Sequence, residues 1–296
     1  MDRLTSPRTI KYIMEKYGFH FSKSLGQNFI IDDHVIERII DGAEVGGEDV
    51  VLEIGPGIGV LTNALCESAQ KVVSIEIDKS LIPVLGETVG HHDNLKIVNQ
   101  DVLKTDVKAL IKEEFGDRKP KLIANLPYYV TTPIIMLFLE ERIPISDLIV
   151  MIQKEVADRI VAGPGTKAYG ALSVVVQYFT EPSIVTRVSR GSFMPMPNVD
   201  STVIRLNVRE NPPVTLLDEE VFFLTIKDAF GKRRKTLLNA LSSGFLKLTK
   251  EQTKLALAEV GIPENMRGEV LTIDEFASLA NAIAKIKGAT NGADNT

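Results

Sequence analysis

Four consecutive residues, Asn125, Leu126, Pro127 and Tyr128, have the types that chemistry on an exocyclic amine such as adenine N6 would need. That nitrogen is a poor nucleophile because its lone pair is delocalised into the ring. Two hydrogen-bond acceptors that hold its N–H bonds out of the ring plane favour the attacking form of the amine. The Asn125 side-chain oxygen and the Leu126 carbonyl can be these two acceptors. Pro127 biases Leu126 towards extended geometry, and Tyr128 offers a flat face to an unstacked base. The alternative is a plain strand followed by a turn.

A glycine-rich turn, residues 55–59, follows the β-branched run from Val50 to Ile54 and precedes a helical segment. A strand, a glycine turn and a helix open a nucleotide-binding α/β unit. Glycines let the backbone approach a ligand where a Cβ would collide. The spacing Gly-x-Gly-x-Gly after Glu53 differs from the dinucleotide fingerprint, and it suits S-adenosylmethionine, whose amino-acid part would pass close to Gly55. Taken alone, this turn does not exclude a dehydrogenase.

Polar groups also end the strand-like runs that follow, at Glu76, Asp101 and Asn125. Ligands of doubly wound sheets bind outside the carboxyl ends of the strands, so we expect these groups to converge on one crevice. Glu76 could accept hydrogen bonds from both ribose hydroxyls of a nucleoside and Asp101 one from the adenine amino group. The polar loop before the helix at residues 35–43 either caps that helix or acts as a lid, with Asn28 and the backbone near Ile30 on the cofactor.

The composition limits the remaining possibilities. The chain has 296 residues, 44% of them apolar, and a net charge of −5, so any nucleic-acid contact needs a local basic patch. A single cysteine, Cys66, excludes an internal disulfide and fits a reducing cytosol. The four histidines have no metal-ligand spacing. The N-terminus has no signal-peptide pattern, and prolines interrupt the uncharged stretch 122–139. We therefore expect a cytoplasmic monomer with no membrane segment.

The second half of the chain divides at Asn211-Pro212-Pro213, after which the pattern becomes helical. Before that point, the pattern predicts a strand at 147–153 and a hairpin of two strands at 183–188 and 202–208. For 172–179, the periodicity does not distinguish a helix from a strand. Phe193 lies in the connector, either as a buried anchor or closing on a base opposite Tyr128. We predict an N-terminal arm at 1–24, a catalytic domain at 25–210, a helical RNA-binding domain at 211–287 and a disordered tail at 288–296.

The densest basic cluster of this acidic chain is Lys232, Arg233, Arg234 and Lys235. Such a run is usually a solvated helix face. On a small helical domain attached to the crevice, it could instead hold the phosphates of RNA.

The order of the motifs GQNF, LEIGPGIG, SIEID, NQD, NLPYY-TTP, FMPMPNVDS and GKRRKTLLNAL resembles that of the ribosomal RNA adenine N6,N6-dimethyltransferases, from residue 20 to about 285. The resemblance is strongest to the bacterial small-subunit (16S) type. It implies a Rossmann-like class I S-adenosylmethionine-dependent methyltransferase domain with a small helical C-terminal domain. The implied substrate is a pair of adjacent adenosines in the 3′-terminal hairpin of 16S rRNA, within a small-subunit precursor, and the implied role is in ribosome biogenesis.

The same resemblance assigns roles to individual residues. It places S-adenosylmethionine on Asn28, Ile30, Gly55, Glu76, Asp101 and Asn125. It places the target base on Asn125, Leu126, Tyr128 and Phe193. Tyr129 stands where the family commonly has a polar residue, which leaves its role open. Methyl transfer from a sulfonium disperses charge, so neither a metal nor a strong base is demanded.

Several alternatives remain to be weighed. A 23S rRNA dimethyltransferase of the macrolide-resistance type is disfavoured by the FMPMPNVDSTVIRL connector and the KRRKTLLNAL segment. A DNA adenine methyltransferase would more often have proline at the position of Leu126. A glutamine methyltransferase would not need the basic helical domain. A non-catalytic ribosome-assembly factor is disfavoured by the full set of acids together with Asn125.

Overall fold

The computed structural model describes residues 3–19, 21, 25–232 and 234–293. The chain forms two compact units, one of Met1–Ala157 with Glu181–Val208 and the other of Asp158–Thr180 with Arg209–Thr296. Residues 158–180, which we expected in the catalytic domain, therefore belong to the second unit. The reason lies in their apolar side chains, because Val174 and Tyr178 are buried in the same core as Phe222.

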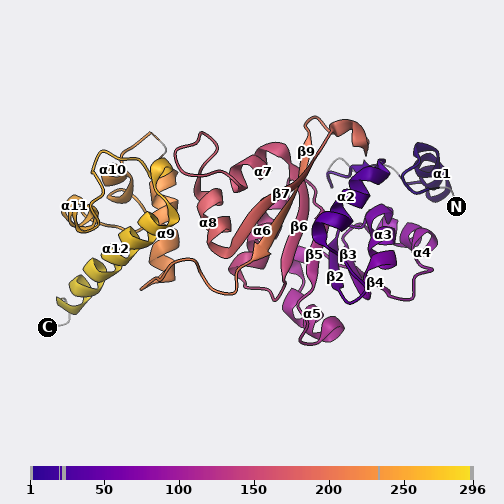
Figure 1. Cartoon of the computed structure of the whole chain (residues 1–296), viewed down its shortest axis with the longest axis horizontal. Helices are drawn as coiled ribbons and strands as arrows, with labels where there is room; N and C mark the ends of the chain where they lie inside the picture. Colours follow the sequence, from indigo (N-terminus) through magenta and orange to yellow (C-terminus); the bar gives the residue numbers. More distant parts are fainter. Residues whose placement is uncertain (1–2, 20, 22–24, 233, 294–296) are drawn as a thin grey trace. The chain divides into compact units, whose positions relative to one another are not determined.

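The first unit is built on a seven-stranded sheet with the strand order β4-β3-β2-β5-β6-β9-β7 (Figure 1). The pairs from β4 to β6 are parallel, and β9 runs antiparallel to β6. Buried parallel strands have nearly continuous apolar runs, which the sequence of β6 displays and that of β2 displays except at Glu53. The strands are β1 Phe29–Ile30, β2 Val50–Ile54, β3 Lys71–Glu76, β4 Leu95–Asn99, β5 Lys121–Asn125, β6 Asp147–Gln153, β7 Thr180–Val188, β8 Phe193–Met194 and β9 Ser201–Val208.

Helices α2 and α3 cover one face of this sheet. Their side chains Ile39 and Leu65 share a buried cluster with Val51, Ile123 and Ile149 of the central strands. The loop before α2 caps it as expected, since the Asp32 carboxylate accepts from the backbone N–H of His34 at 3.1 Å. The helices up to residue 160 are α1 Pro7–Tyr17, α2 Asp33–Ala43, α3 Val60–Ser68, α4 Ile82–Thr88, α5 Val107–Phe115, α6 Thr131–Glu140 and α7 Lys154–Ile160, with short 3-10 helices η1 Lys79–Leu81, η2 Val102–Lys104 and η3 Arg190–Ser192.

The carboxyl ends of the four central parallel strands meet at one edge of the sheet. Ile54 is in register with both Ile75 and Ala124, and Ile75 is in register with Val98. The polar residues that follow these strands therefore leave the sheet at the same level. This arrangement confirms the Rossmann-like class expected from the sequence.

A two-stranded antiparallel sheet lies outside the main one. Strand β1 pairs with β8, so Ile30 faces Phe193 and Phe29 faces Met194. A further bond joins the Ile31 N–H to the Ser192 carbonyl at 2.9 Å. The connector that we expected to be only a loop therefore contains a strand, and it is fixed to the segment around Asn28.

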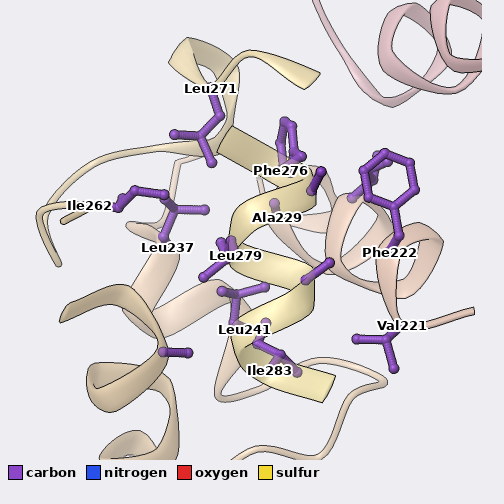
Figure 2. Packing of buried hydrophobic residues seen from close by; sticks show 14 of the residues in the cluster. Val221, Phe222, Ala229, Leu237, Leu241, Ile262, Leu271, Phe276, Leu279 and Ile283 are labelled. Atoms are coloured by element: carbon purple, nitrogen blue, oxygen red, sulfur yellow. The ribbon is translucent and has the colours of Figure 1, made fainter. Parts of the chain in front are cut away.

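The second unit is helical. Segment 172–179, left undecided by its periodicity, lies in a helix. Figure 2 shows the buried side chains of this unit, among them Phe222, Leu237, Leu241 and Phe276, which are all almost completely buried. The helices are α8 Ala171–Phe179, α9 Glu219–Gly231, α10 Leu237–Leu241, α11 Lys250–Glu259 and α12 Ile273–Ala293, with the 3-10 helix η4 Gly268–Val270.

Two expectations for this unit are corrected. Helix α12 continues to Ala293, so the tail predicted to be disordered from residue 288 is helical up to that residue, and its last three residues lie outside the described part of the chain. The basic cluster is not on a helix face, because Lys232, Arg234 and Lys235 form a turn between α9 and α10. Arg233 is outside the described residues. In the described chain, no helix combines the length and the apolar character that a membrane crossing requires.

Candidate active site

The strand-end groups surround one cavity of the first unit. Its volume is about 1120 Å³, counted with the solvent at its mouth. Gly55 follows β2, Glu76 ends β3, Asp101 follows β4 and Asn125 ends β5, and all of them line this cavity. The other residues that the sequence analysis assigned to the cofactor or the base, which are Asn28, Ile30, Leu126, Tyr128 and Phe193, line it as well.

The glycine turn after β2 requires its glycines. Gly55, Gly57 and Gly59 have φ values of +71°, +62° and +90°, a region that other residues rarely adopt. A Cβ on Gly57 would lie 2.9 Å from the Phe29 ring, so the lid segment, which is residues 25–30 before α2, packs tightly against this turn. A Cβ on Gly55 would meet no protein atom within 4 Å. The space beside Gly55 is therefore open to a ligand in the cavity.

Glu76 is buried at the end of β3, with 4% of its surface exposed. Its carboxylate accepts from the backbone N–H of Asp78 at 2.7 Å and from that of Gly57 at 3.2 Å. Burial raises the pKa of this carboxyl, although the backbone donors oppose the shift. Each carboxylate oxygen has a further lone pair, so Glu76 can still accept from a diol while it links β3 to the glycine turn.

Asp101 has a structural role in addition to its place in the cavity. Its carboxylate accepts from the Leu103 N–H at 3.1 Å, which caps η2, and lies 3.4 Å from the Lys104 ammonium. The exposed side chains of Ile77 and Leu103 line the cavity near these two acids. Apolar walls beside an acceptor are the surroundings that the adenine ring of a nucleoside needs.

Asn125 is oriented by the lid segment. Its Nδ2 donates to the Asn28 carbonyl at 3.0 Å. Its Oδ1 accepts no hydrogen bond from the described residues, and the same is true of the Leu126 carbonyl oxygen. The Leu126 side chain is 1% exposed, so this residue can offer a ligand only its main chain. Two free acceptors therefore follow each other at the end of β5.

Tyr128 is fixed by its hydroxyl. The Oη atom lies 2.8 Å from Oγ of Ser201, the buried first residue of β9. Burial is also the main reason that the pKa of Tyr128 is raised. The ring is half-buried and lines the cavity, so one aromatic wall is held in place next to the two free acceptors.

Phe193 reaches the cavity from β8, where it faces Ile30 across the small sheet. It is 4% exposed and belongs to the same buried cluster as Ile30 and Val35. The structure therefore places Phe193 as a packed anchor of the wall, and Tyr128 presents more of its ring.

Two cavity residues, Gln27 and Glu53, were missed as functional candidates, and Tyr129 had its role left open. Gln27 donates to the Asp78 carboxylate at 2.7 Å and so ties the lid segment to the end of β3. Tyr129 is 56% exposed at the cavity. Glu53, inside the apolar run of β2, is 1% exposed and accepts from Thr62 and Ser74 hydroxyls. Burial raises the pKa of Glu53 to about 7. An acid within an apolar strand was the available signal.

The sequence of this chain is similar to that of known proteins over nearly its whole length. Residues 18–285 match a family model described as ribosomal RNA adenine dimethylase. A protein from Alkaliphilus oremlandii (strain OhILAs), named ribosomal RNA small subunit methyltransferase A, is 56% identical over 285 residues, which is 96% of this chain and 99% of that protein.

Solved structures agree with this similarity. A dimethyladenosine transferase from Plasmodium falciparum matches with a TM-score of 0.71 and 25% identity, over 88% of this chain and 98% of that one. The 23S rRNA methyltransferase ErmE matches with a TM-score of 0.67 and 26% identity, over 87% of this chain and 100% of that one. The sequence identity to the small-subunit relative, 56%, is thus more than twice the 26% identity to ErmE.

Proposed function

The chain belongs to the ribosomal RNA adenine dimethylase family, and from this premise we propose that it dimethylates N6 of two adjacent adenosines in the 3′-terminal hairpin of 16S rRNA. Membership makes it an S-adenosylmethionine-dependent rRNA adenine dimethyltransferase. The choice of the small subunit is supported by 56% identity to a small-subunit methyltransferase, against 26% to a 23S rRNA methyltransferase. A partly assembled small subunit is the proposed form of the substrate.

The observation that carries this proposal is the pair of free acceptors at the end of β5. The Asn125 amide is held by its bond to Asn28, which leaves Oδ1 available next to the Leu126 carbonyl. Both line the same cavity as Gly55 and Glu76. This arrangement also argues against a non-catalytic assembly factor, because a protein that only bound RNA would have no need of it.

The residues present fit S-adenosylmethionine. The open space beside Gly55 admits its amino-acid part, Glu76 can accept from the ribose hydroxyls, and Asp101 with its apolar neighbours can hold the adenine. When bound, this cofactor supplies a methyl group on an electrophilic sulfonium.

In the proposed mechanism, Asn125 and the Leu126 carbonyl accept from the N–H bonds of the target amine and turn its lone pair towards the methyl group. Such positioning can contribute roughly 7–11 kcal/mol of the barrier. The base is extruded at a cost of a few kcal/mol, and stacking on Tyr128 offsets this cost by about 1–3 kcal/mol. Each transfer forms an N–C bond, and the methylated nitrogen then releases one proton to solvent water. The amine therefore keeps one N–H after the first transfer, so one acceptor still orients it for the second.

The proposal also assigns rRNA phosphates to the basic cluster Lys232–Lys235. Its described members Lys232, Arg234 and Lys235 are exposed, in a chain with a net charge of −5. A local cluster of this kind supplies the favourable field that the chain as a whole lacks.

The test is methyl transfer from labelled S-adenosylmethionine to unmodified small subunits and, separately, to unmodified large subunits, with the methylated nucleotides mapped. The expected product is N6,N6-dimethyladenosine at two neighbouring positions of the small-subunit 3′ hairpin. Transfer to large subunits alone would contradict the choice of substrate. Tight binding to small subunits without transfer would favour an assembly factor.

A further inference from the structure

An exposed phenylalanine on the second unit is held in a fixed position. Phe245 lies in the loop after α10 and is 63% exposed. Its N–H and that of Leu246 donate to the two carboxylate oxygens of Asp228, at 2.8 and 2.9 Å. Leu246 is 2% exposed and packs in the core of the unit. The loop therefore points Phe245 outward and the next residue, Leu246, inward.

The loop fits closely against Asp228, which is 4% exposed. A Cβ on Gly244 would lie 2.1 Å from the Asp228 carboxyl carbon, so only glycine is accommodated there. A buried carboxylate is costly unless it is hydrogen-bonded. Here the backbone of the loop satisfies it, and the same bonds fix the position from which the Phe245 ring projects.

Exposure alone would not single out this residue, because isolated apolar side chains are common on protein surfaces. Leu217 and Leu255 of the same unit are 62% and 64% exposed. Phe245 differs in its surroundings. The Lys227 ammonium lies 4.0 Å from the ring centroid, and the Lys232 ammonium donates to the Ser243 hydroxyl at 2.8 Å.

These contacts join the loop that carries Phe245 to the basic cluster Lys232–Lys235. Lys232 is the first residue of that cluster, and its bond to Ser243 holds the cluster's turn beside the loop that carries Phe245. Lys247, two residues after Phe245, is exposed. Neither Lys227 nor Lys247 is ion-paired with any carboxylate in the part of the chain that is described. An exposed ring with one cation over it and further cations on its own loop and on the neighbouring turn is complementary to a polyanion that carries planar bases.

We propose that Phe245 is a stacking platform for an unpaired nucleotide of the rRNA substrate, which stacks on the ring face opposite the Lys227 ammonium, with Lys227, Lys232 and Lys247 binding neighbouring phosphates. This inference rests on the proposed function, because it takes rRNA as the partner. Base–aromatic stacking tolerates any base, so the platform adds affinity and a fixed point of attachment without reading sequence. The base specificity stays with the cavity of the first unit.

A tryptophan at this position gives a direct readout. The chain contains no tryptophan, so Phe245→Trp introduces a single indole. Stacking on a base should quench its fluorescence when unmodified, protein-free 16S rRNA is added, and added salt should reverse the quenching as the complex dissociates. Unchanged fluorescence at RNA concentrations that saturate binding in a filter assay would overturn the proposal.

Affinity measurements on the full chain provide the second test. Phe245→Ala should weaken RNA binding by roughly 5- to 150-fold, which corresponds to the cost of about 1–3 kcal/mol for a lost stacking contact. Phe245→Tyr, which keeps the ring, should bind as the wild type does. Leu255→Ala removes an equally exposed apolar side chain of the same unit and should have no effect. Equal affinities of Phe245→Ala and Leu255→Ala would refute the platform.

The failure of this inference is distinguishable from failure of the proposed function. If the wild-type chain methylates small subunits and Phe245→Ala binds and reacts normally, the platform is wrong and the function stands. If the wild-type chain fails to methylate small subunits while rRNA still quenches the indole of Phe245→Trp, the platform stands and the function is wrong. Quenching by complete subunits but not by protein-free rRNA would identify a ribosomal protein as the partner and overturn the inference.

Discussion

Asn125 is oriented by a bond that lies outside its own strand. Its Nδ2 donates to the Asn28 carbonyl, and this bond fixes which end of the amide faces the cavity. In the proposed reaction, the lid segment therefore contributes through the direction in which it turns this side chain.

Replacing Asn125 by alanine should abolish most of the transfer. We expect kcat to fall by about 100-fold or more, the scale at which one preorganised polar contact to the transition state is lost. Binding of S-adenosylmethionine and of RNA should stay within a few-fold, as measured by calorimetry and filter binding. Asn63→Ala, which removes an amide bonded to Glu67 outside the cavity, is the matched control. Unchanged turnover of Asn125→Ala would exclude the acceptor role.

The buried Glu53 makes stability depend on pH. Burial raises its pKa from 4.5 to about 7 in the folded protein. The folded state then binds more protons than the unfolded state between these values, so this group destabilises the fold progressively as pH rises from about 4.5 to about 7.

Glu53→Gln should remove this loss, since glutamine keeps an acceptor for Thr62 and Ser74 without the charge. The free energy of unfolding of the variant, relative to the wild type, should increase by about 3 kcal/mol over that pH range. Urea unfolding at several pH values measures this difference. A constant difference across the range would show that Glu53 does not titrate there.

At the scale of elements, the glycine turn and the lid segment pack so closely that a change in one displaces the other. Gly57 has a φ of +62°, and a side chain there would meet the Phe29 ring at 2.9 Å. Phe29 is in β1, so a change in the turn reaches β8 through the pairing of these two strands.

Gly57→Ala should therefore lower both stability and cofactor affinity. The backbone alone should cost about 1–2 kcal/mol, with further loss from displacing Phe29. Gly86→Ala is the control, because that glycine lies inside α4 with no atom near its missing Cβ. It should raise stability by about 0.4–1 kcal/mol. Thermal unfolding with and without S-adenosylmethionine separates the two effects, and equal behaviour of both variants would contradict this account.

The parts that the sequence predicted well are local ones. Strands β2, β3 and β5 were identifiable because an apolar run and the polar residue that ends it are adjacent in sequence. Helix α8 was undecidable because Val174, Val175 and Val176 continue an apolar run without polar interruptions, so no period was visible. The pairing of Ile30 with Phe193 joins segments that are distant in sequence, and neither segment contains a pattern that predicts which strand it pairs with. The bond from Asn125 to Asn28 was not predictable for the same reason.

At the scale of the whole molecule, charge is uneven. A chain with a net charge of −5 must bind a polyanion through limited areas, and the turn between α9 and α10 is the area that we propose. This cluster lies in a turn, where we had expected a helix face. The side chains of Arg234 and Lys235 therefore do not follow the regular spacing of a helix.

The double variant Arg234→Ala and Lys235→Ala should weaken binding to unmodified small-subunit rRNA and reduce its salt dependence. Each lost phosphate contact lowers the slope of log affinity against log salt by about 0.7–0.9. Lys254→Ala with Lys285→Ala removes the same charge from lysines that are paired with Glu264 and Glu259. This control should leave the slope unchanged. A slope that the first double variant does not alter would show that the cluster is only solvated.

The division of the chain into units has a consequence for inheritance. The backbone passes from one unit to the other after Ala157, Thr180 and Val208. A single genetic crossover between two relatives at the last of these points would combine α8 from one parent with α9 from the other, although Tyr178 and Phe222 must interlock. Recombination should therefore rarely exchange the helical unit alone, and the two halves of this enzyme are expected to diverge as a matched pair.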